Sequence, residues 1–317
     1  GTALDRPPGN EKAHILAALD ALDAGGSTHG RAGITLAYTL AEQYKPDGGI
    51  NRVIIASDGD MNVGTVDLQA LKDLVARKRS TGIALTTLGF GRGNYNYALM
   101  EQLADVGNGN AAYIDSLREA QKVLVNQLQS TLLTIASDVK VQVEFNPAAV
   151  SEYRLIGYEN RLLNREDFTN DKVDAGEIGA GHTVTALYEI VLADGGGQRV
   201  QPLRYANTAT ARRDLATELA YIKLRYKRPG DVDSRELSTP VMRRDLSAGL
   251  DASSEDLRFA ASVAGFAQLL QGGTFTGSWG YDDALALARQ SRGADLHGYR
   301  SELVNLIELA QSLSSGG

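Results

Sequence analysis

The feature that most constrains this chain is a short apolar run that stops at two acidic residues. Val53 to Ala56 form an unbroken apolar stretch, which is the pattern of a strand buried on both faces. Ser57, Asp58 and Asp60 follow it. Because ligands of open α/β sheets collect at the carboxyl ends of strands, these acids indicate a site for a hard cation. The alternative interpretation is that Asp58 only caps a turn before the next helix.

Helical and strand-like segments alternate through the first part of the chain. Strands are predicted at 83–88 and 111–114, and helices at 11–24, from Ser27-Thr28 to Tyr44, from about Val66, at 96–106 and along an apolar stripe from Leu117 to Leu132. Strands that alternate with helices at this spacing imply βαβ units and a mostly parallel sheet. Three visible strands are few for a doubly wound sheet.

The hydrophobic period changes after residue 137. In the stretch VKVQVEF at 139–145, apolar residues alternate with polar ones, which predicts a half-buried strand with its apolar side chains inward. The same period recurs at 184–190, 203–205 and 220–226. We therefore predict an antiparallel β region, of the sandwich type, with the polar stretch 157–182 as a long excursion between strands.

From residue 251 onward the period is helical again. Helices are predicted at 257–270, 281–288 and 299–310, and Asp295 is placed to cap the last of them. The loop before the second helix holds the only tryptophan, Trp279, and we expect this ring to pack against its own helices. The chain is thus predicted to divide into an α/β part at 1–137, a β region at 138–250 and a helical segment at 251–317.

Composition excludes several classes of function. The 317 residues are more than one compact domain usually needs, and the net charge of −7 argues against a surface that binds nucleic acid. The absence of cysteine removes disulfides, thiolate metal sites and a cysteine nucleophile. No apolar run approaches the roughly 18 residues needed to span a bilayer, so we expect a soluble chain without a transmembrane segment.

The common catalytic and binding motifs are missing from the sequence. An EF-hand is rejected because Val63 and Gln69 replace the glycine and the glutamate that its loop requires. The glycines at 89, 91 and 93 lack dinucleotide spacing, and no histidine has a partner at the spacing of a zinc helix. No serine lies in a nucleophile elbow. We therefore predict that the protein is not an enzyme.

Two residues still predict a metal site after these motifs are excluded. Thr28 opens a helix after two glycines, and Asp58 ends the first visible strand, so the two loops are predicted to meet at one edge of the sheet. A hydroxyl, a carboxylate and water molecules together make an octahedral Mg²⁺ site.

These residues resemble a known family. The series Gly25-Gly26-Ser27-Thr28, then VIIASDG at 53–59 with Asn62-Val63-Gly64, then Leu88-Gly89-Phe90-Gly91 followed by Asn94-Tyr95-Asn96, is similar to the second half of a von Willebrand factor type A domain. The likeness extends to the bacterial envelope proteins of the YfbK type, whose A domain precedes a β region and a helical segment. Residues 265–312, with the stretch GSWGYDD at 277–283, look like that segment.

The resemblance implies a metal-ion-dependent adhesion site. Thr28 would be the threonine ligand and Asp58 the aspartate of the later loop, with Ser27 and Asp60 as weaker candidates. The cation would be Mg²⁺, or Mn²⁺ or Ca²⁺, and its open position would take an acidic side chain of a protein partner. By the same resemblance we expect a non-enzymatic protein located in the cell envelope or periplasm.

The sequence departs from the family pattern at its first element. The family's opening strand ends in D-x-S-x-S, and this sequence has no such motif. We expect either that the chain is a fragment of a longer protein or that the missing portion is supplied separately. Only Thr28 and Asp58 remain of the ligand set. We therefore predict that this chain alone binds metal weakly or not at all, so that its site can stay unoccupied.

A second function remains open on the same resemblance. Bacterial A domains of this kind also occur in scaffold or regulatory subunits that act with an ATPase of the chaperone type. An ATPase among the captured partners would favour that function, and envelope or surface proteins would favour adhesion. A hydrolytic enzyme is the third alternative.

Overall fold

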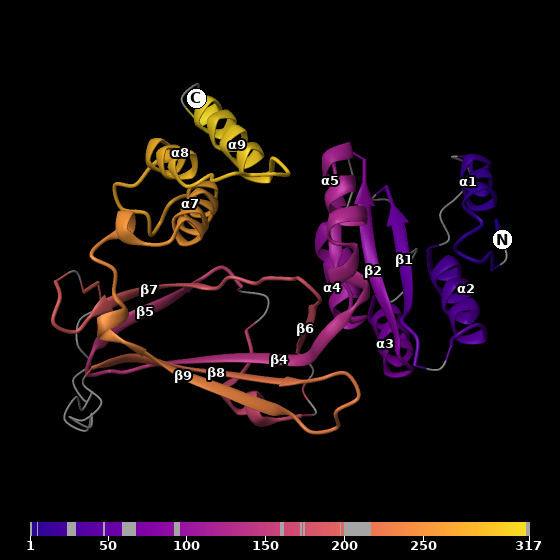
Figure 1. The fold of residues 1–317 in the computed structure, drawn as a ribbon, viewed down its shortest axis with the longest axis horizontal. Helices are drawn as coiled ribbons and strands as arrows, with labels where there is room; N and C mark the ends of the chain where they lie inside the picture. Colours follow the sequence, from indigo (N-terminus) through magenta and orange to yellow (C-terminus); the bar gives the residue numbers. More distant parts are fainter. Residues whose placement is uncertain are drawn as a thin grey trace. The chain divides into compact units, whose positions relative to one another are not determined.

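A computed structural model gives the fold of the chain (Figure 1). The structure describes residues 2–4, 6–23, 30–46, 48–58, 68–91, 96–158, 162–171, 173, 175–196, 198–199 and 217–314. The chain divides into two compact units, Gly1–Leu133 and Thr134–Gly317. The three-part division of the sequence stays a prediction.

The first unit is an α/β structure in which helices surround a parallel sheet (Figure 1). Within the described residues β1 pairs with β2 and β2 with β3, and both pairs are parallel, as predicted. Its elements in chain order are α1 (Lys12–Asp20), α2 (Gly30–Gln43), β1 (Asn51–Ser57), α3 (Leu68–Ser80), β2 (Ile83–Phe90), α4 (Tyr97–Val106), β3 (Ala111–Ile114), α5 (Leu117–Gln121), η1 (Lys122–Asn126) and α6 (Leu128–Leu132).

Three helices and two strands bury one apolar core in this unit. The core takes apolar side chains from the inward stripes of α2, α3 and α4 and from one face of β1 and β2. On the sheet Val53 and Leu85 are register neighbours, and both are buried. The fully buried members include Tyr38, Leu71, Val75, Ile83, Leu85 and Leu103. This burial holds β1 and β2 in the register that aligns their carboxyl ends.

The predicted continuous helix from Leu117 to Leu132 is wrong. The segment consists of α5, a π-helical turn at η1 and α6, and the backbone N–H of Gln127 donates to the carbonyl of Lys122 at 2.8 Å. A π turn inserts one extra residue, so side chains at four-residue spacing no longer share one face. Leu117, the first residue of the predicted stripe, is 90% exposed.

Within its described residues the second unit combines antiparallel sheets with three α-helices, as predicted. A four-stranded sheet has the order β6-β4-β8-β9, and β5 pairs with β7. The elements are β4 (Thr134–Phe145), β5 (Val150–Ile156), η3 (Arg165–Thr169), β6 (Gly176–Gly179), β7 (Leu187–Leu192), β8 (Glu218–Lys227), β9 (Arg235–Met242), η6 (Arg243–Asp245), η7 (Leu250–Ala252), α7 (Glu255–Leu270), α8 (Tyr281–Gln290) and α9 (Tyr299–Ser314). The strand predicted at 203–205 lies outside the described residues.

Several details of the β region differ from the prediction, which had no strands at the positions of β5 and β9. The stretch 157–182 contains η3 and the short strand β6, so it is not a simple excursion. On β4, Val141 is 61% exposed whereas Lys140 is 1% exposed, which reverses the expected inward and outward faces at this point. The reason lies in the partners that the Lys140 side chain finds inside.

A buried aspartate explains the buried lysine. Asp138 lies between two cations, with Lys140 Nζ 3.1 Å and Lys227 Nζ 3.2 Å from its carboxylate oxygens. These contacts are ion pairs by distance rather than aligned hydrogen bonds. Lys140 Nζ also donates to the backbone carbonyl of Asn170 at 2.7 Å. A buried ammonium group is tolerated only with such partners, so this cluster fixes how the stretch after η3 lies on β4.

The helical segment packs around Trp279, as predicted. The ring joins the apolar cluster of α7, α8 and α9, which includes Phe266, Leu285 and Ile307. Gly265 lies so close to it that a Cβ atom there would be 1.8 Å from Cζ3 of the ring. The absence of a side chain at residue 265 is therefore what lets α7 accept the tryptophan.

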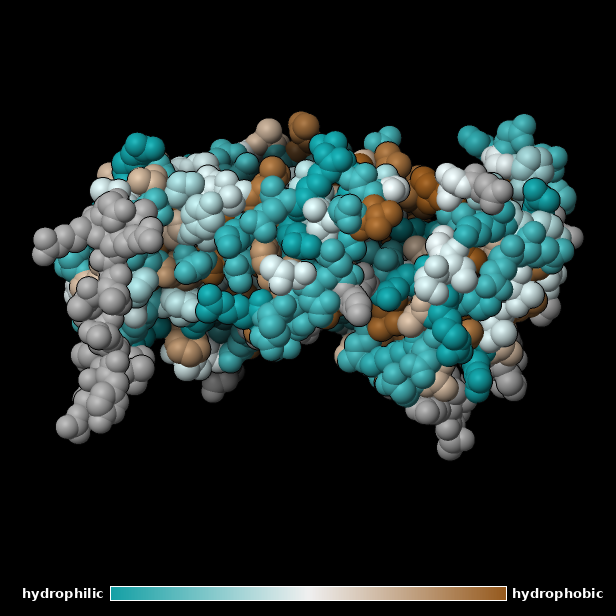
Figure 2. Space-filling view, turned by 90° about the horizontal axis from the view of Figure 1, so that it is seen from below, coloured by the Kyte–Doolittle hydropathy of each residue, from teal (hydrophilic) through white to brown (hydrophobic). Residues whose placement is uncertain are grey.

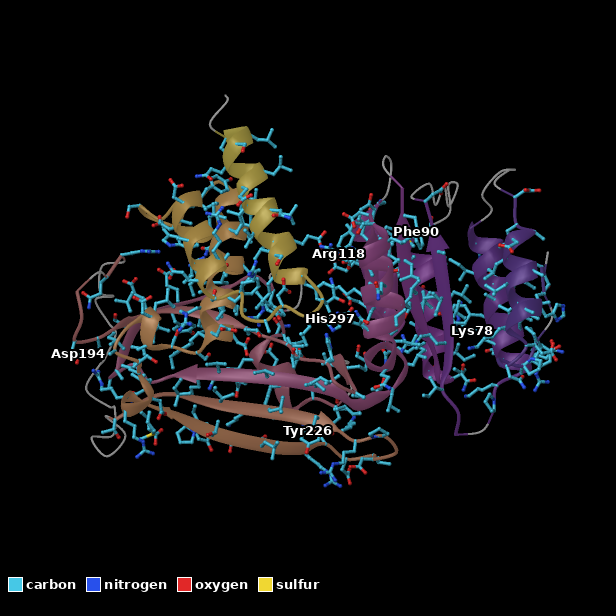
Figure 3. All side chains as sticks on the ribbon, turned by 45° about the horizontal axis from the view of Figure 1, so that its top comes forward. Lys78, Phe90, Arg118, Asp194, Tyr226 and His297 are labelled. Carbon is cyan, nitrogen blue, oxygen red and sulfur yellow. The ribbon has the colours of Figure 1, made fainter. Side chains whose placement is uncertain are left out.

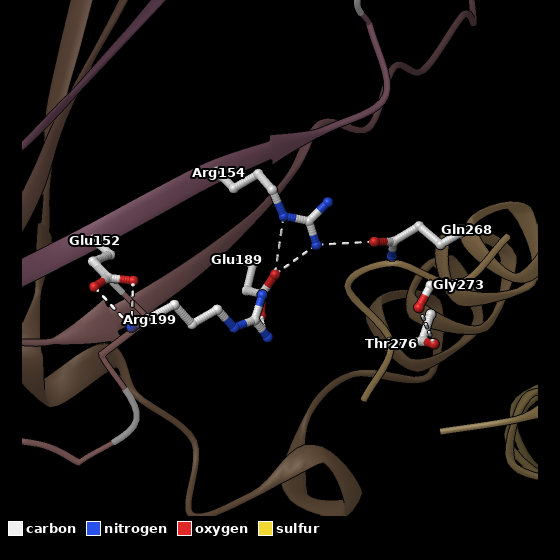
Figure 4. Close-up of polar contacts among 7 residues, drawn as sticks. All are labelled: Glu152, Arg154, Glu189, Arg199, Gln268, Gly273 and Thr276. Carbon is white, nitrogen blue, oxygen red and sulfur yellow. Dashed lines mark hydrogen bonds and ion pairs between the residues drawn. The ribbon is translucent and has the colours of Figure 1, made fainter. Parts of the chain in front are cut away.

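Polar contacts join the helical segment to the β5–β7 pair (Figure 4). Arg154 on β5 donates through Nε to Glu189 on β7 at 3.1 Å and through Nη2 to Gln268 on α7 at 2.9 Å. The Arg154 guanidinium also lies 4.2 Å from the centre of the Phe275 ring. Arg199 donates to the second oxygen of Glu189 at 2.9 Å. Arg154 thus links β5, the strand on which it lies, to both β7 and α7.

None of the described helices is both long and apolar enough to cross a bilayer. The face drawn in Figure 2 is mainly hydrophilic, with its apolar residues in small separate groups.

We expect Gly265→Ala to destabilise the helical segment by about 1–3 kcal/mol, because the new methyl group overpacks the Trp279 ring. Gly33→Ala is the matched control, since Gly33 also lies within a helix but has no atom within 4 Å of its Cβ position; it should stabilise by about 1 kcal/mol. Urea unfolding followed by far-ultraviolet circular dichroism, which reports the helices of both units, measures both variants. Equal effects of the two variants would contradict the packing.

We expect Asp138→Asn to destabilise the second unit by about 3–5 kcal/mol, because it leaves the buried Lys140 ammonium without its counter-charge. Asp231→Asn removes the carboxylate of a more exposed pair with Arg235 and should cost less than about 1 kcal/mol. Chemical denaturation of both variants gives the comparison. A loss below about 1 kcal/mol for Asp138→Asn would show that the cluster is not needed for the fold.

Candidate functional site

The carboxyl ends of three parallel strands form one edge of the first sheet. Ser57 at the end of β1 pairs with Gly89. Phe90, labelled in Figure 3, is at the end of β2 and pairs with Ile114 at the end of β3. The residues that follow the three strands are Asp58, Gly91 and Asp115. Parallel pairing therefore brings an aspartate, a glycine and a second aspartate to the same edge.

Asp58 lies against the backbone of Gly91. A Cβ atom at Gly91 would be 3.5 Å from the backbone oxygen of Asp58 and 3.8 Å from its Cβ, which is ordinary contact. Gly91 has φ of +82°, a backbone conformation that residues with side chains rarely adopt. The hydroxyl of Tyr113 on β3 donates to the Gly91 carbonyl. Contacts across three strands thus position Asp58 at this edge.

Asp58 is exposed at the strand end, and its side chain carries carboxylate oxygens. Such an oxygen suits a hard cation, and the exposure fits a ligand that acts directly or through water. Asp115 is also exposed, but β2 separates the two aspartates. Two strand spacings amount to about 10 Å, which is too far for one cation to bind both directly.

The remaining predicted ligands lie outside the described residues. These are Thr28, Ser27 and Asp60. Among the residues that the structure describes, no group of three or more acidic or histidine side chains could hold a metal ion. The described part of the chain therefore offers one predicted oxygen ligand, Asp58, and the rest of the metal site stays a prediction.

Two residues at this edge were missed by sequence reasoning. Asp115 follows the strand 111–114 in the same way that Asp58 follows its strand, so the pattern was present in the sequence. The role of Tyr113 in holding Gly91 had no such signal, because it depends on the pairing of β2 with β3.

Comparisons with known proteins cover both units. Residues 4–131 match the family described as von Willebrand factor type A domain, and residues 130–313 match the family described as "Uncharacterized protein YfbK, C-terminal". The chain is 46% identical over 313 residues to "Uncharacterized protein YfbK" of Escherichia coli (strain K12), covering 98% of this chain and 53% of the relative. The chain thus spans about half the length of this curated relative.

Two solved structures show more distant similarity. A "von Willebrand factor type A from Catenulispora acidiphila" is 15% identical, with a TM-score of 0.40, and the match covers 91% of this chain and 66% of that one. The human COPII-coat protein Sec24c is 9% identical, with a TM-score of 0.35, and the match covers 81% of this chain and 34% of that one.

We expect Gly91→Ala to destabilise the first unit by about 1–2 kcal/mol, because alanine is strained at this positive φ. Gly9→Ala is the control, since no atom lies within 4 Å of its Cβ position and its φ is not positive; the change should stay within about 0.5 kcal/mol. Thermal unfolding measures both. An unchanged unfolding temperature for Gly91→Ala would contradict the described turn.

Proposed function

The chain belongs to the family of YfbK-like proteins with a von Willebrand factor type A domain, and on this premise we propose that it is a non-enzymatic protein-binding module of the adhesion type. Domains of this type are generally interaction modules rather than enzymes. The proposal concerns this chain alone, which spans about half the length of its curated relative. By likeness to envelope proteins it includes a location in the bacterial cell envelope.

The observation that carries the proposal is the exposed Asp58 at the carboxyl edge of the parallel sheet. In the proposal Asp58 and Thr28 bind Mg²⁺, or Mn²⁺ or Ca²⁺, with Ser27 and Asp60 nearby as weaker candidates. All four side chains supply the oxygen ligands that these hard cations prefer.

The cation would recognise a partner through charge. A divalent ion with an open coordination position accepts a carboxylate from a second protein, and the contact excludes water from both. Such a contact is strong only while the cation is present, since the carboxylate would otherwise meet Asp58 directly and be repelled. Metal dependence is therefore the signature of this function.

The ligand set is incomplete in this sequence, because it lacks the D-x-S-x-S motif. A cation held by one hydroxyl and one carboxylate keeps most of its water shell and exchanges readily. The proposed site thus has low affinity in this chain by itself.

We expect calorimetry of the purified chain with Mg²⁺ or Mn²⁺ to show no stoichiometric binding at micromolar concentrations. The reason is the short ligand set, with only Thr28 and Asp58 as main ligands. Stoichiometric micromolar binding would contradict this prediction and would mean that other side chains complete the site.

We expect capture of a protein partner in excess Mg²⁺ to be lost on adding EDTA and lost in Asp58→Ala. Asp115→Ala is the matched control, because Asp115 is another exposed acid at the same edge and should leave capture intact. Capture that withstands both EDTA and Asp58→Ala would overturn the adhesion proposal. If the partner captured in that way were an ATPase, the scaffold alternative would take its place.

A further inference from the structure

A hollow of about 330 Å³ lies in the second unit, beside the loop that joins α8 to α9. Its walls come from this loop, from Glu255 at the start of α7 and from Tyr299 and Arg300 at the start of α9. Every residue of the wall is described and belongs to the second unit. The hollow shares no residue with the edge that holds Asp58.

The acidic side chains of the hollow are already used by the fold. Asp295 accepts the backbone N–H of Arg300 at 3.0 Å and the N–H of Ser301 at 2.8 Å, so it caps α9 as the sequence predicted. Burial alone would raise the pKa of Asp295, but the hydrogen bonds from Ser301 and Arg300, together with the nearby charge of Arg292, outweigh it, and the pKa is lowered. Asp295 is therefore an anion committed to the helix end.

The guanidinium group of Arg300 also has its partners within the fold. Its guanidinium donates to the carbonyl of Ser291 at 3.1 Å, lies 3.6 Å from Glu255 and pairs with Asp256. Neither Arg300 nor these acids needs a ligand to complete its contacts. What the hollow offers to a ligand must come from other side chains.

Three other residues of the loop are left to face a ligand. Arg292 is exposed; its charge contributes to lowering the pKa of Asp295, but it makes no hydrogen bond or ion pair within 4.0 Å with the described residues. Leu296 is 89% exposed. His297, labelled in Figure 3, stacks on Tyr299 with ring centres 5.5 Å apart. The loop thus presents a cation, an apolar side chain and a ring with an N–H donor next to one hollow.

The loop is held in place rather than extended freely. The N–H of Gly298 donates to the carbonyl of Asp295 at 2.9 Å. Gly293 and Gly298 have φ of +63° and +75°, and Asp295 itself has φ of +41°. An ordered loop that keeps a leucine almost fully exposed gains nothing from that leucine in folding. The exposed leucine instead suits contact with another molecule.

We propose that this loop binds a carboxylate side chain of an acidic peptide segment, with an apolar residue of the segment packed on Leu296. The Arg292 guanidinium pairs with the carboxylate, and His297 closes one wall. A phosphate group would also suit an arginine, but Glu255 and Asp295 line the same hollow. These anions repel a doubly charged phosphate more strongly than a singly charged carboxylate, so the carboxylate is favoured.

The test is an NMR titration of the whole chain, labelled at its leucine methyl groups, with the peptide acetyl-Leu-Glu-Leu-amide as the probe. EDTA is present throughout, so that a cation at Asp58 plays no part. We expect the methyl signals of Leu296 to shift until they saturate. The peptide acetyl-Leu-Gln-Leu-amide and inorganic phosphate should produce much smaller shifts at equal concentration, because they lack a singly charged carboxylate.

Arg292→Gln should weaken binding of the glutamate peptide about three- to fivefold, the range for an exposed charge pair. Arg244→Gln is the matched control, because Arg244 is an exposed arginine of the same unit away from the hollow, and its affinity should be unchanged. Leu296→Ser should weaken binding through the lost apolar contact. The unfolding temperatures of all three variants should match that of the parent chain.

Several outcomes would overturn the proposal. These are an absence of shifts at Leu296, equal binding of the glutamine peptide, equal binding of phosphate, or equal affinity of Arg292→Gln and Arg244→Gln. None of them bears on the metal-dependent proposal for Asp58, because the titration contains no free divalent cation.

Discussion

Parallel pairing of β1, β2 and β3 is the constraint on which the candidate metal site depends. Strands that run in one direction bring all their carboxyl ends to a common edge, and helices between them return the chain for the next strand. Burial of Val53 beside Leu85 fixes the register of β1 on β2. A slip by one residue would turn Val53 to the opposite face and move Asp58 away from Gly91. The position of one exposed carboxylate therefore rests on buried apolar residues far from it.

Much of this fold could be predicted from apolar periodicity, and its errors have physical causes. The strand at 111–114 and the three C-terminal helices were predicted because one face of each is apolar. The strand β9 was missed because it is exposed at nearly every position, so no apolar face marks it. The break at η1 was missed because a π turn depends on backbone hydrogen bonds and not on side-chain pattern.

The candidate sites were likewise predictable where a local sequence pattern marks them, and not where they depend on packing between distant segments. Asp58 could be found from the sequence because it directly follows a buried strand, and Asp295 because it precedes a helix. The hollow beside α9 could not be found, because Glu255 and Arg292 are far apart in the chain and meet only through the packing of α7 and α9 around α8. Thr28 stays a prediction, since it lies outside the described residues.

The two cationic side chains Lys140 and Arg292 show how burial decides what a charge does. Lys140 is buried, where an unpaired ammonium group is costly. Its ammonium group therefore pairs with Asp138 and donates to the Asn170 carbonyl, and these contacts stabilise the fold. Arg292 is outside, where water solvates an unpaired guanidinium at little cost, so its charge stays available to a carboxylate from another molecule. That availability also limits its strength, because salt screens an exposed pair. A carboxylate bound to a divalent cation at the sheet edge would be attracted by twice the charge, so the proposed metal-dependent contact is the stronger of the two wherever its cation is held.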